Sequence, residues 1–364
     1  MKSGMKFDVI VVGGGPAGAT AALKCSLLGF NVMLLERAPF WSKPCGGLLT
    51  PLCQMILYKR GGAKIPSNIL SNPPILNVCY IFLENMATSV INYRLLNVRR
   101  RLLDVWLREY ALRRGVEVWH GAELVELVEV EPIKVLVKAG GRCRVVETKY
   151  LIGADGVYSK VRSQLFPNTN FEVAPAIQEY WAGGGNLKDY FYVFFSEKLT
   201  RAYAYLIPKD NSIIVGIWAP REDIDVMGTR IELFRKLLME KFSFKPRFLI
   251  RREVWAVPYQ CGVVEGAGNI ILIGDAAGFY NTLTGEGIGY AVESALAAGE
   301  SILEASIGGG EASKIYRERV KERNAFLKEM HRVATNLTDD DRRNFIEFLR
   351  RYASTSSHLD LKFM

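Results

Sequence analysis

The sequence is poor in the residues that build metal sites and histidine-based triads. Its 364 residues contain three histidines, and its six cysteines are scattered without a Cys-x-x-Cys pair. This pattern disfavours a zinc site, a triad and a disulfide framework, so we predict no metal site. His120 ends an expected strand but receives no role, because a lone histidine is more often structural.

Long apolar runs are also missing. None approaches the roughly 18 residues that a membrane-spanning helix needs, and the first fifteen residues run into a strand and a Gly-rich turn rather than a secretory signal. We therefore expect a cytoplasmic protein. Any association with a membrane is expected to be peripheral. The net charge of +9 comes from scattered basic clusters without a nucleic-acid-binding module, so we expect no nucleic-acid partner.

What is present begins with the pattern of a βαβ unit. Residues 7–12 and 31–35 are apolar, β-branched runs typical of buried parallel strands, and residues 16–28 between them have helical spacing. Residues 101–114 predict a further amphipathic helix. A parallel-type strand returns at 269–273.

The middle of the chain has the pattern of antiparallel sheets. Residues 123–139 and 142–151 alternate like two paired strands around the Gly140-Gly141 turn. From about 171 to 258, aromatic-rich strand patterns surround one expected helix, 230–242. This indicates a second, sheet-based part inserted into the first. The end of the chain reads as helical, with helices expected at 287–305 and 339–351.

A dinucleotide fingerprint follows the first expected strand. The segment from Gly13 to Gly18 reads Gly-Gly-Gly-Pro-Ala-Gly and satisfies GxGxxG between a strand and a helix. Gly13 allows the tight turn, Gly15 lets the backbone approach a pyrophosphate, and Gly18 lets the helix pack close to the strand. Glu36 ends the second strand about 20 residues on, where its carboxylate is placed to accept ribose hydroxyls.

Two later segments favour FAD over NAD as the dinucleotide. Residues 270–278 form a strand that delivers Asp275 at its tip, placed for the ribityl or ribose part of a long flavin dinucleotide. Residues 284–288, Thr-Gly-Glu-Gly-Ile, open a helix whose N–H groups are placed to stabilise the negative charge of a reduced flavin. We therefore predict one FAD site and a flavin-dependent oxidoreductase.

With these segments, nearly the whole chain resembles the flavoprotein group that includes aromatic hydroxylases, halogenases and geranylgeranyl reductases. Residues 100–104 match that group's Arg-xxx-Asp helix start, and residues 153–162 match its second, Asp-Gly fingerprint. Ala122 follows the strand expected to lie against the adenine. A second GxGxxG for NAD(P) is absent, which argues against the disulfide-reductase branch.

Within that group, three features are similar to the geranylgeranyl reductases. Residues 44–47, Pro-Cys-Gly-Gly, resemble their Cys-Gly-Gly signature. Gly278 and Ile288 stand where hydroxylases usually carry a His and an Asn. Residues 203–208 are similar to the aromatic-x-aromatic-x-x-Pro strand that lines the reductases' substrate cavity.

Three residues depart from what is usual in that family. Leu48 stands where a further small residue is common, Thr282 where a proline is usual, and Tyr205 where a Trp is usual. The departures leave the exact substrate open.

Fingerprints and resemblance together predict the site residues. Cys45 is the predicted catalytic thiol, as proton donor or conformational gate; the alternative is a small residue in a tight turn. Predicted substrate contacts are Tyr203, Tyr205 and Pro208, and Phe191 and Phe194 are expected to wall the same apolar tunnel unless they only fill the core. The predicted FAD contacts are Gly13, Gly15, Ala17, Gly18, Glu36, Arg37, Cys45, Gly46, Gly47, Leu48, Arg100, Ala122, Asp275, Gly285, Gly287 and Ile288.

The resemblance implies an FAD-dependent reductase of isolated C=C bonds in isoprenoid, geranylgeranyl-type chains of lipids. A hydride would come from N5 of the reduced flavin and a proton from the site. An electron donor is then required, either reduced ferredoxin or NAD(P)H. Two alternatives stay open: a flavin-dependent monooxygenase, that is a hydroxylase of a small substrate, and a non-catalytic, electron-carrying flavoprotein.

The predicted fold class is α/β. We expect a Rossmann-type FAD-binding domain, an inserted antiparallel-sheet (α+β) substrate-binding domain and a helical C-terminus. The FAD-binding domain is predicted at 1–60, 95–170 and 259–310, the substrate-binding domain at 61–94 and 171–258, and the helical segment at 311–364.

Overall fold

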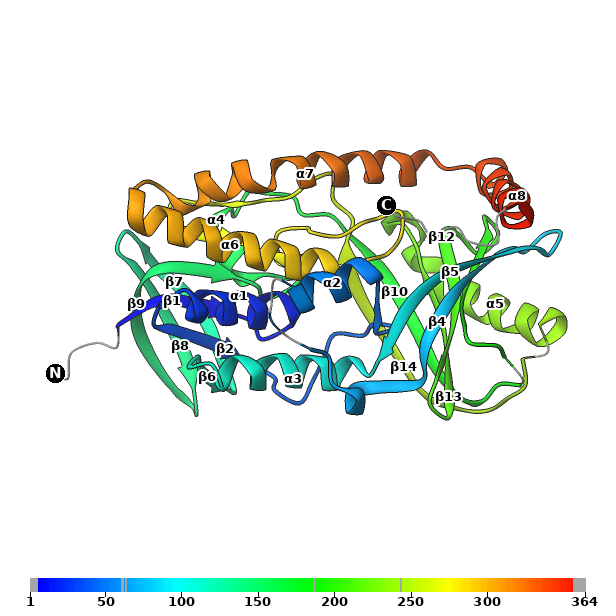
Figure 1. Cartoon of the computed structure of the whole chain (residues 1–364), viewed down its shortest axis with the longest axis horizontal. Coiled ribbons are helices and arrows are strands. Elements are labelled where there is room, and N and C mark those ends of the chain that lie inside the picture. Colours follow the sequence, from blue (N-terminus) through cyan, green and yellow to red (C-terminus); the bar gives the residue numbers. More distant parts are fainter. Residues whose placement is uncertain (1–5, 60–61, 63, 186, 243, 356–364) are drawn as a thin grey trace.

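The computed structural model describes residues 6–59, 62, 64–185, 187–242 and 244–355. Predicted ranges that include residues 1–5, 60, 61, 63, 186, 243 and 356–364 lie outside the described residues at those positions. The described chain is α/β and contains two eight-stranded sheets. The first sheet and its helices form one half of the molecule and the second sheet the other (Figure 1).

The first sheet is built around the predicted βαβ unit. β1 (Lys6–Val12) runs parallel to β2 (Val32–Glu36), and α1 (Pro16–Leu27) connects them. Both strands are buried, as their continuous apolar runs predict. β6 (Glu117–His120), β9 (Arg142–Gly153), β15 (Gly266–Ala267) and β16 (Ile270–Leu272) extend the sheet in the order β15-β16-β9-β1-β2-β6. The strand expected at 269–273 is confirmed as β16, which is parallel to β9.

An antiparallel meander joins this sheet. β7 (Ala122–Val130) and β8 (Ile133–Ala139) pair with each other, and β8 pairs with the first half of β9 across Gly140-Gly141. The expectation of one strand over 123–139 was wrong, because the chain reverses between Val130 and Ile133. Its alternation continues through the reversal, whereas Pro132 is the residue that marks a break.

The second sheet takes strands from four parts of the chain. Its order is β14-β10-β13-β12-β11-β4-β5-β3, and every neighbouring pair is antiparallel except β4 and β11. Residues 48–49 and 95–98 lie in strands of this second sheet, although the predicted boundaries assign them to the FAD-binding domain. The strands are β3 (Leu48–Leu49), β4 (Leu70–Phe82), β5 (Ala87–Val98), β10 (Val173–Gly183), β11 (Tyr190–Ser196), β12 (Thr200–Lys209), β13 (Ser212–Trp218) and β14 (Pro246–Pro258).

Seven further α-helices lie in the described chain, and four of them confirm helices expected from the sequence. α1 packs against α6 and α3, and α7 packs on α6. The helices are α2 (Pro51–Lys59), α3 (Arg100–Leu112), α4 (Lys160–Leu165), α5 (Met227–Lys241), α6 (Ile288–Gly308), α7 (Ala312–Asn336) and α8 (Asp339–Thr355). Short 3₁₀ turns occur at Ser67–Ile69, Arg221–Val226 and Gly274–Ala276.

The two faces of the second sheet have different neighbours. α5 covers the outer face with the buried side chains of Ile231, Phe234 and Leu238. Phe194 lies on this face, fully buried, with its ring 5.1 Å from that of Phe234. The expectation that Phe194 walls the substrate tunnel was therefore wrong. Phe191, three residues earlier, points to the opposite face, since side chains alternate along a strand.

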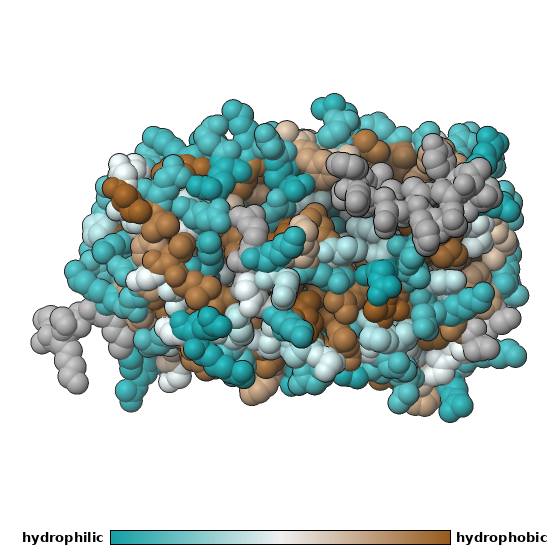
Figure 2. Space-filling view, in the orientation of Figure 1, coloured by the Kyte–Doolittle hydropathy of each residue, from teal (hydrophilic) through white to brown (hydrophobic). Residues whose placement is uncertain are grey.

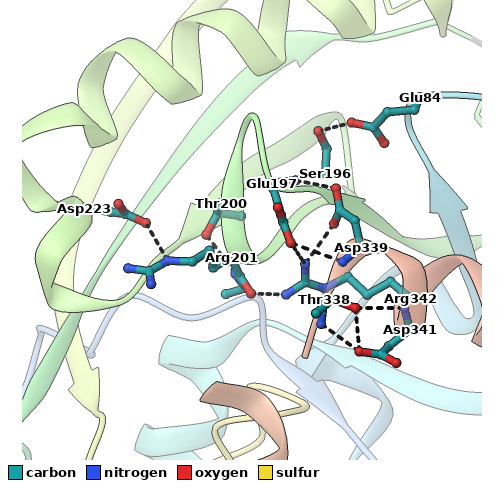
Figure 3. Close-up of polar contacts among 11 residues, drawn as sticks. Glu84, Ser196, Glu197, Thr200, Arg201, Asp223, Thr338, Asp339, Asp341 and Arg342 are labelled. Atoms are coloured by element: carbon teal, nitrogen blue, oxygen red, sulfur yellow. Dashed lines mark hydrogen bonds and ion pairs between the residues drawn. The ribbon is translucent and has the colours of Figure 1, made fainter. Parts of the chain in front are cut away.

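α8 packs over β4, β5 and β11 at the end of the second sheet. Arg342 in this helix is 2% exposed, and its guanidinium donates to Asp339 Oδ1 over 2.9 Å and to the Arg201 carbonyl. Asp339 and Glu197 exchange two hydrogen bonds of 3.1 Å, each backbone N–H donating to the other's carboxylate (Figure 3). The turn between β11 and β12 is thus joined to the start of α8.

No helix in the described part of the chain is long and apolar enough to cross a membrane. The face in Figure 2 mixes polar and apolar residues, and apolar ones gather over its middle.

Candidate FAD-binding active site

A cavity of about 350 Å³ connects the two halves of the molecule. It begins at the GxGxxG turn and the carboxyl end of β2. It continues past the loop between β2 and β3 and ends on the inner face of the second sheet. Its shape joins a nucleotide fingerprint to an aromatic surface in one continuous space.

Each fingerprint glycine has its own structural reason. A Cβ on Gly13, which has a φ of +100°, would lie 2.5 Å from the Ala154 carbonyl oxygen. A Cβ on Gly18 would lie 1.8 Å from the Gly13 carbonyl oxygen. A Cβ on Gly15 would meet nothing within 4 Å, because this residue faces the cavity at the N-terminus of α1. The turn therefore leaves open space where backbone N–H groups and the helix dipole favour a pyrophosphate.

Glu36 lies at the adenosine end of the cavity. Its two carboxylate oxygens accept from the backbone N–H groups of Gly14 and Ala38, over 2.9 and 2.7 Å. Arg108 lies 3.9 Å from the same carboxylate and donates to the Gly14 carbonyl over 3.0 Å. Each carboxylate oxygen keeps a lone pair for a ribose hydroxyl. Arg37 and Ala122 line the cavity beside it.

Arg100, Asp104 and Arg108 form one polar face of α3. They are spaced four residues apart, so their side chains lie on the same side of the helix. Arg100 Nε donates to Asp104 Oδ1 over 2.9 Å. Burial opposes the charge of Arg100, but Asp104 and Cys45 outweigh it and raise the pKa of Arg100. The guanidinium therefore stays charged next to the middle of the cavity.

Asp275 and the start of α6 meet the cavity from the C-terminal part of the chain. The Asp275 carboxylate pairs with the Lys43 ammonium, which comes from the loop after β2. Gly285, Gly287 and Ile288 line the cavity where α6 begins. The N–H groups of this first turn lack helical partners and give the site a positive end.

The Asp-Gly fingerprint, residues 153–162, contacts the segment that carries Asp275. Asp155 accepts from the Ser159 hydroxyl and from the Lys160 and Val161 N–H groups, which caps α4. Arg162 in that helix donates to the carbonyls of Val157 and Ala276, both over 2.7 Å. The side chain thus fixes the residue next to Asp275.

The Cys45 loop lies between the two sheets. The Gly47 N–H donates to Cys45 Sγ over 3.3 Å, so the thiol is held as an acceptor beside the cavity. A Cβ on Gly46 would lie 2.5 Å from Ile207 Cδ1. The loop therefore packs directly on β12.

Aromatic side chains of the second sheet form the other wall. Tyr203 donates to the Thr284 carbonyl over 2.9 Å, and the Tyr205 hydroxyl donates to Gln178 Oε1 over 3.3 Å. Phe191 packs on both rings. Burial raises the pKa of both tyrosines well above the usual value, so they stay protonated.

The structure brings together most of the predicted site residues. All predicted FAD contacts except Gly18 line the cavity, as do Tyr203, Tyr205 and Phe191. Gly18 serves the fold of the turn instead. Pro208 does not line the cavity, and Ile207 takes that place because side chains alternate along β12. The roles of these residues stay predictions.

Sequence reasoning missed several cavity residues. Glu286 lines it, accepts from the Thr50 hydroxyl over 2.7 Å, and has a pKa that burial raises. Arg108 has a usable signal, the four-residue spacing after Arg100 and Asp104. Tyr158 lies within the Asp-Gly fingerprint, and the others that line the cavity without a local signal are Trp41, Lys43, Gln178, Trp218 and Trp255.

Three of the missed residues make an aromatic cluster. The rings of Trp41 and Trp255 lie 4.9 Å apart, and Tyr158 meets Trp255 at 5.8 Å. Trp41 and Tyr158 are 46% and 62% exposed, so the cluster forms a boundary between cavity and solvent.

The residues present fit FAD. Open space over Gly15, a ribose-directed carboxylate at Glu36 and a helix N-terminus at Gly287 lie along one cavity. A pyrophosphate requires the first of these, the ribose of an adenosine the second and a flavin ring the third.

Comparisons with known proteins agree with this reading. Residues 8–75 match the model of the family described as FAD dependent oxidoreductase. The chain is 32% identical over 299 residues to protein CbrA of Escherichia coli O9:H4 (strain HS), covering 79% of each chain. It is 31% identical over 298 residues to protein CbrA of Escherichia coli K12, covering 79% of this chain and 82% of that protein.

Solved structures share the whole fold. A geranylgeranyl bacteriochlorophyll reductase-like protein from Thermoplasma acidophilum superposes with a TM-score of 0.84 at 19% identity, covering 95% of this chain and 91% of that one. The myxobacterial chondrochloren halogenase superposes with a TM-score of 0.70 at 18% identity, covering 99% and 92%. Fold and site together define an FAD-dependent oxidoreductase. Within that class, the chain belongs to the family of protein CbrA.

Proposed function

We propose that this oxidoreductase reduces isolated C=C bonds in isoprenoid, geranylgeranyl-type chains of lipids. One observation supports this most: the Cys45-Gly46-Gly47 loop faces a single cavity that joins the FAD fingerprint to an aromatic wall. A long apolar chain needs such a wall, because apolar surface binds where water is excluded. The likeness to a geranylgeranyl bacteriochlorophyll reductase-like protein, which shows the fold alone, is compatible with this substrate.

The residues above would hold FAD, which in its reduced form would supply the hydride for one alkene carbon. The protein's residues then have three tasks. Tyr203, Tyr205 and Phe191 orient the chain and exclude water, since an isolated alkene has no carbonyl to polarise. Cys45 is proposed to deliver the proton to the second alkene carbon or to gate access to it. The N-terminus of α6 and Arg100 keep the site electropositive, which favours negative charge on the cofactor.

We also propose how the site is supplied. Reduced ferredoxin or NAD(P)H is the electron donor, since the chain carries one dinucleotide fingerprint and that one is used by FAD. A peripheral contact with a membrane would deliver the lipid. In support, Trp41 and Tyr158 are exposed at the cavity boundary and Phe40, next to Trp41, is 78% exposed.

The test is anaerobic turnover. The protein is reduced with dithionite and given a geranylgeranylated lipid, and the masses of the products are measured by mass spectrometry. We expect a gain of two hydrogens for each bond reduced, and a loss of at least about tenfold in rate for Cys45→Ala, as removal of a positioned acid costs. Cys261→Ala, at an exposed thiol outside the cavity lining, is the control and should match the parent.

Two results would refute the proposal. A reduced protein that leaves the lipid unchanged but reacts rapidly with oxygen and a small substrate would be a monooxygenase. The fold, which this chain shares with a halogenase, is compatible with that alternative. A flavin that exchanges electrons but converts neither substrate would be a carrier.

A further inference from the structure

A buried lysine beside the Cys45 loop has no task in the function proposed above. Lys209 ends β12 and is 7% exposed. Its ammonium donates to the Gly46 carbonyl and, over 2.9 Å, to Asn97 Oδ1. Both acceptors are uncharged. Burying an ammonium is costly, so the bonds that it makes there must be strong and specific.

Asn97 fixes one side of this arrangement. It is fully buried in β5, and its amide nitrogen donates to the carbonyls of Pro73 and Pro208, both over 2.9 Å. These two bonds leave Oδ1 as the atom that faces Lys209. The Asn97 side chain that accepts from the ammonium is therefore itself fixed by bonds to β4 and β12.

Gly46 and Gly47 form the other side. A Cβ on Gly47 would lie 2.2 Å from the Val98 carbonyl oxygen and 2.9 Å from Lys209 Nζ. The Gly47 carbonyl accepts from the Val98 N–H over 2.8 Å. The loop therefore packs closely on β5. Lys209 adds a charged hydrogen bond to the loop. Cys45 is the residue directly before this contact.

We propose that Lys209 is a positioning residue that holds the Cys45-Gly46-Gly47 loop on the second sheet and so sets where the Cys45 thiol stands in the cavity. The catalytic use of that position rests on the proposed function. The anchoring does not, because it concerns bonds within the chain.

The charge on Lys209 is sensitive to its surroundings. Burial lowers the pKa of Lys209 to about 8. Cys45 and Asp210 favour the charged form, whereas Arg99 opposes it. Above that pH the ammonium becomes an amine, whose hydrogen bonds to the Gly46 carbonyl and to Asn97 are weaker.

The test replaces Lys209 with Met and follows the Val98 amide by hydrogen exchange, since its N–H reports on the Gly47 carbonyl. We expect Val98 exchange to become about tenfold faster or more, as the loss of a charge-assisted bond predicts. Strands of the first sheet should be unchanged. Lys198→Met, at an exposed lysine in the turn between β11 and β12, is the matched control.

A second readout measures the thiol itself. With the exposed Cys143 and Cys261 changed to Ser, a neutral alkylating reagent should modify Cys45 several-fold faster in Lys209→Met than in the parent, because the released loop exposes the thiol. Loss of the nearby ammonium alone would instead slow the reaction. If Lys209→Met does not fold, Val98 exchange in the parent is compared at about pH 6.5 and about pH 9.5, corrected for intrinsic rates. Faster corrected exchange at the higher pH supports the anchor.

Unchanged Val98 exchange and unchanged alkylation in Lys209→Met would overturn the inference, as would a corrected exchange rate that does not depend on pH. A protein that shows loop release but leaves prenyl lipid untouched would keep the inference and refute the proposed function.

Discussion

At the residue scale, the fingerprint glycines separate what the fold needs from what the cofactor needs. Gly18 lies against the Gly13 carbonyl, so its missing side chain allows α1 to pack on the turn. Gly15 faces the cavity, and a Cβ added to it would meet nothing within 4 Å. The same motif therefore contains one glycine kept for packing and one kept for ligand approach.

Replacing Gly15 should affect FAD binding, whereas replacing Gly18 should affect stability. Gly15→Val should fold normally and bind FAD at least about tenfold more weakly, because the side chain fills the pyrophosphate space. Gly18→Ala should lose about 1–3 kcal/mol of stability, because its Cβ forces α1 away from β1. FAD titration and urea unfolding measure the two. Equal FAD affinity in Gly15→Val and the parent would contradict the placement of the pyrophosphate.

Motif chemistry explains why the FAD end of the site could be predicted. Glu36 and Asp275 follow strands of known direction, and each does line the cavity. Lys43 and Lys209 could not be predicted in this way, since each acquires its role from a partner far along the chain. Arg108 is intermediate, because its helical spacing after Arg100 and Asp104 was readable.

At the scale of elements, β11 shows how alternation assigns function. Phe191 faces the cavity, and Phe194 is buried under α5 with its ring 5.1 Å from that of Phe234. Both residues look alike in the sequence. Phe191 and Phe194 point to opposite faces of β11 because one position is odd and the other even. Which of the two belongs to the core is known only once the face that α5 covers is known.

Alanine at these two positions should separate stability from binding. Phe194→Ala should lower the free energy of unfolding by about 3–5 kcal/mol, as for other buried phenylalanines. Phe191→Ala should cost less stability and raise the KM for a prenyl lipid, since it removes part of the proposed wall. Chemical denaturation and steady-state kinetics measure the two. Similar stability losses for both variants would show that Phe191 is also core.

The contacts of Arg342 in α8 lead to a second prediction at the scale of elements. Arg342→Ala should destabilise the protein by about 1–3 kcal/mol and speed protease cleavage near residue 338, because it removes a buried guanidinium and its hydrogen bonds to Asp339 and to the Arg201 carbonyl (Figure 3). Arg343→Ala is the matched control. Its exposed pair with Asp340 should contribute at most about 0.5 kcal/mol. Equal cleavage in the two variants would mean that the Arg342 network does not hold α8.

Elements with continuous apolar runs or strict helical spacing were predicted well. β4 and β14 were not, because prolines interrupt the first, at Pro73 and Pro74, and charges interrupt the second. The hairpin between β7 and β8 was missed for the opposite reason: its alternation is unbroken through the turn.

At the scale of the whole molecule, the site exists only because two sheets face each other. The first sheet carries the fingerprint, the second carries the aromatic wall, and the Cys45 loop and Tyr203 connect them. Fold class was predictable from the sequence. Which residues meet across the cavity was not, since that depends on the packing of segments such as 41–50, 203–207 and 284–288.

The most direct test of the account is the anaerobic reoxidation of the reduced flavin by lipid. The reduced protein is mixed with a geranylgeranylated lipid and, separately, with its fully saturated counterpart, and the flavin spectrum is followed. The account predicts rapid reoxidation with the unsaturated lipid and none with the saturated one. Equal rates with both, or reoxidation by neither, would contradict it.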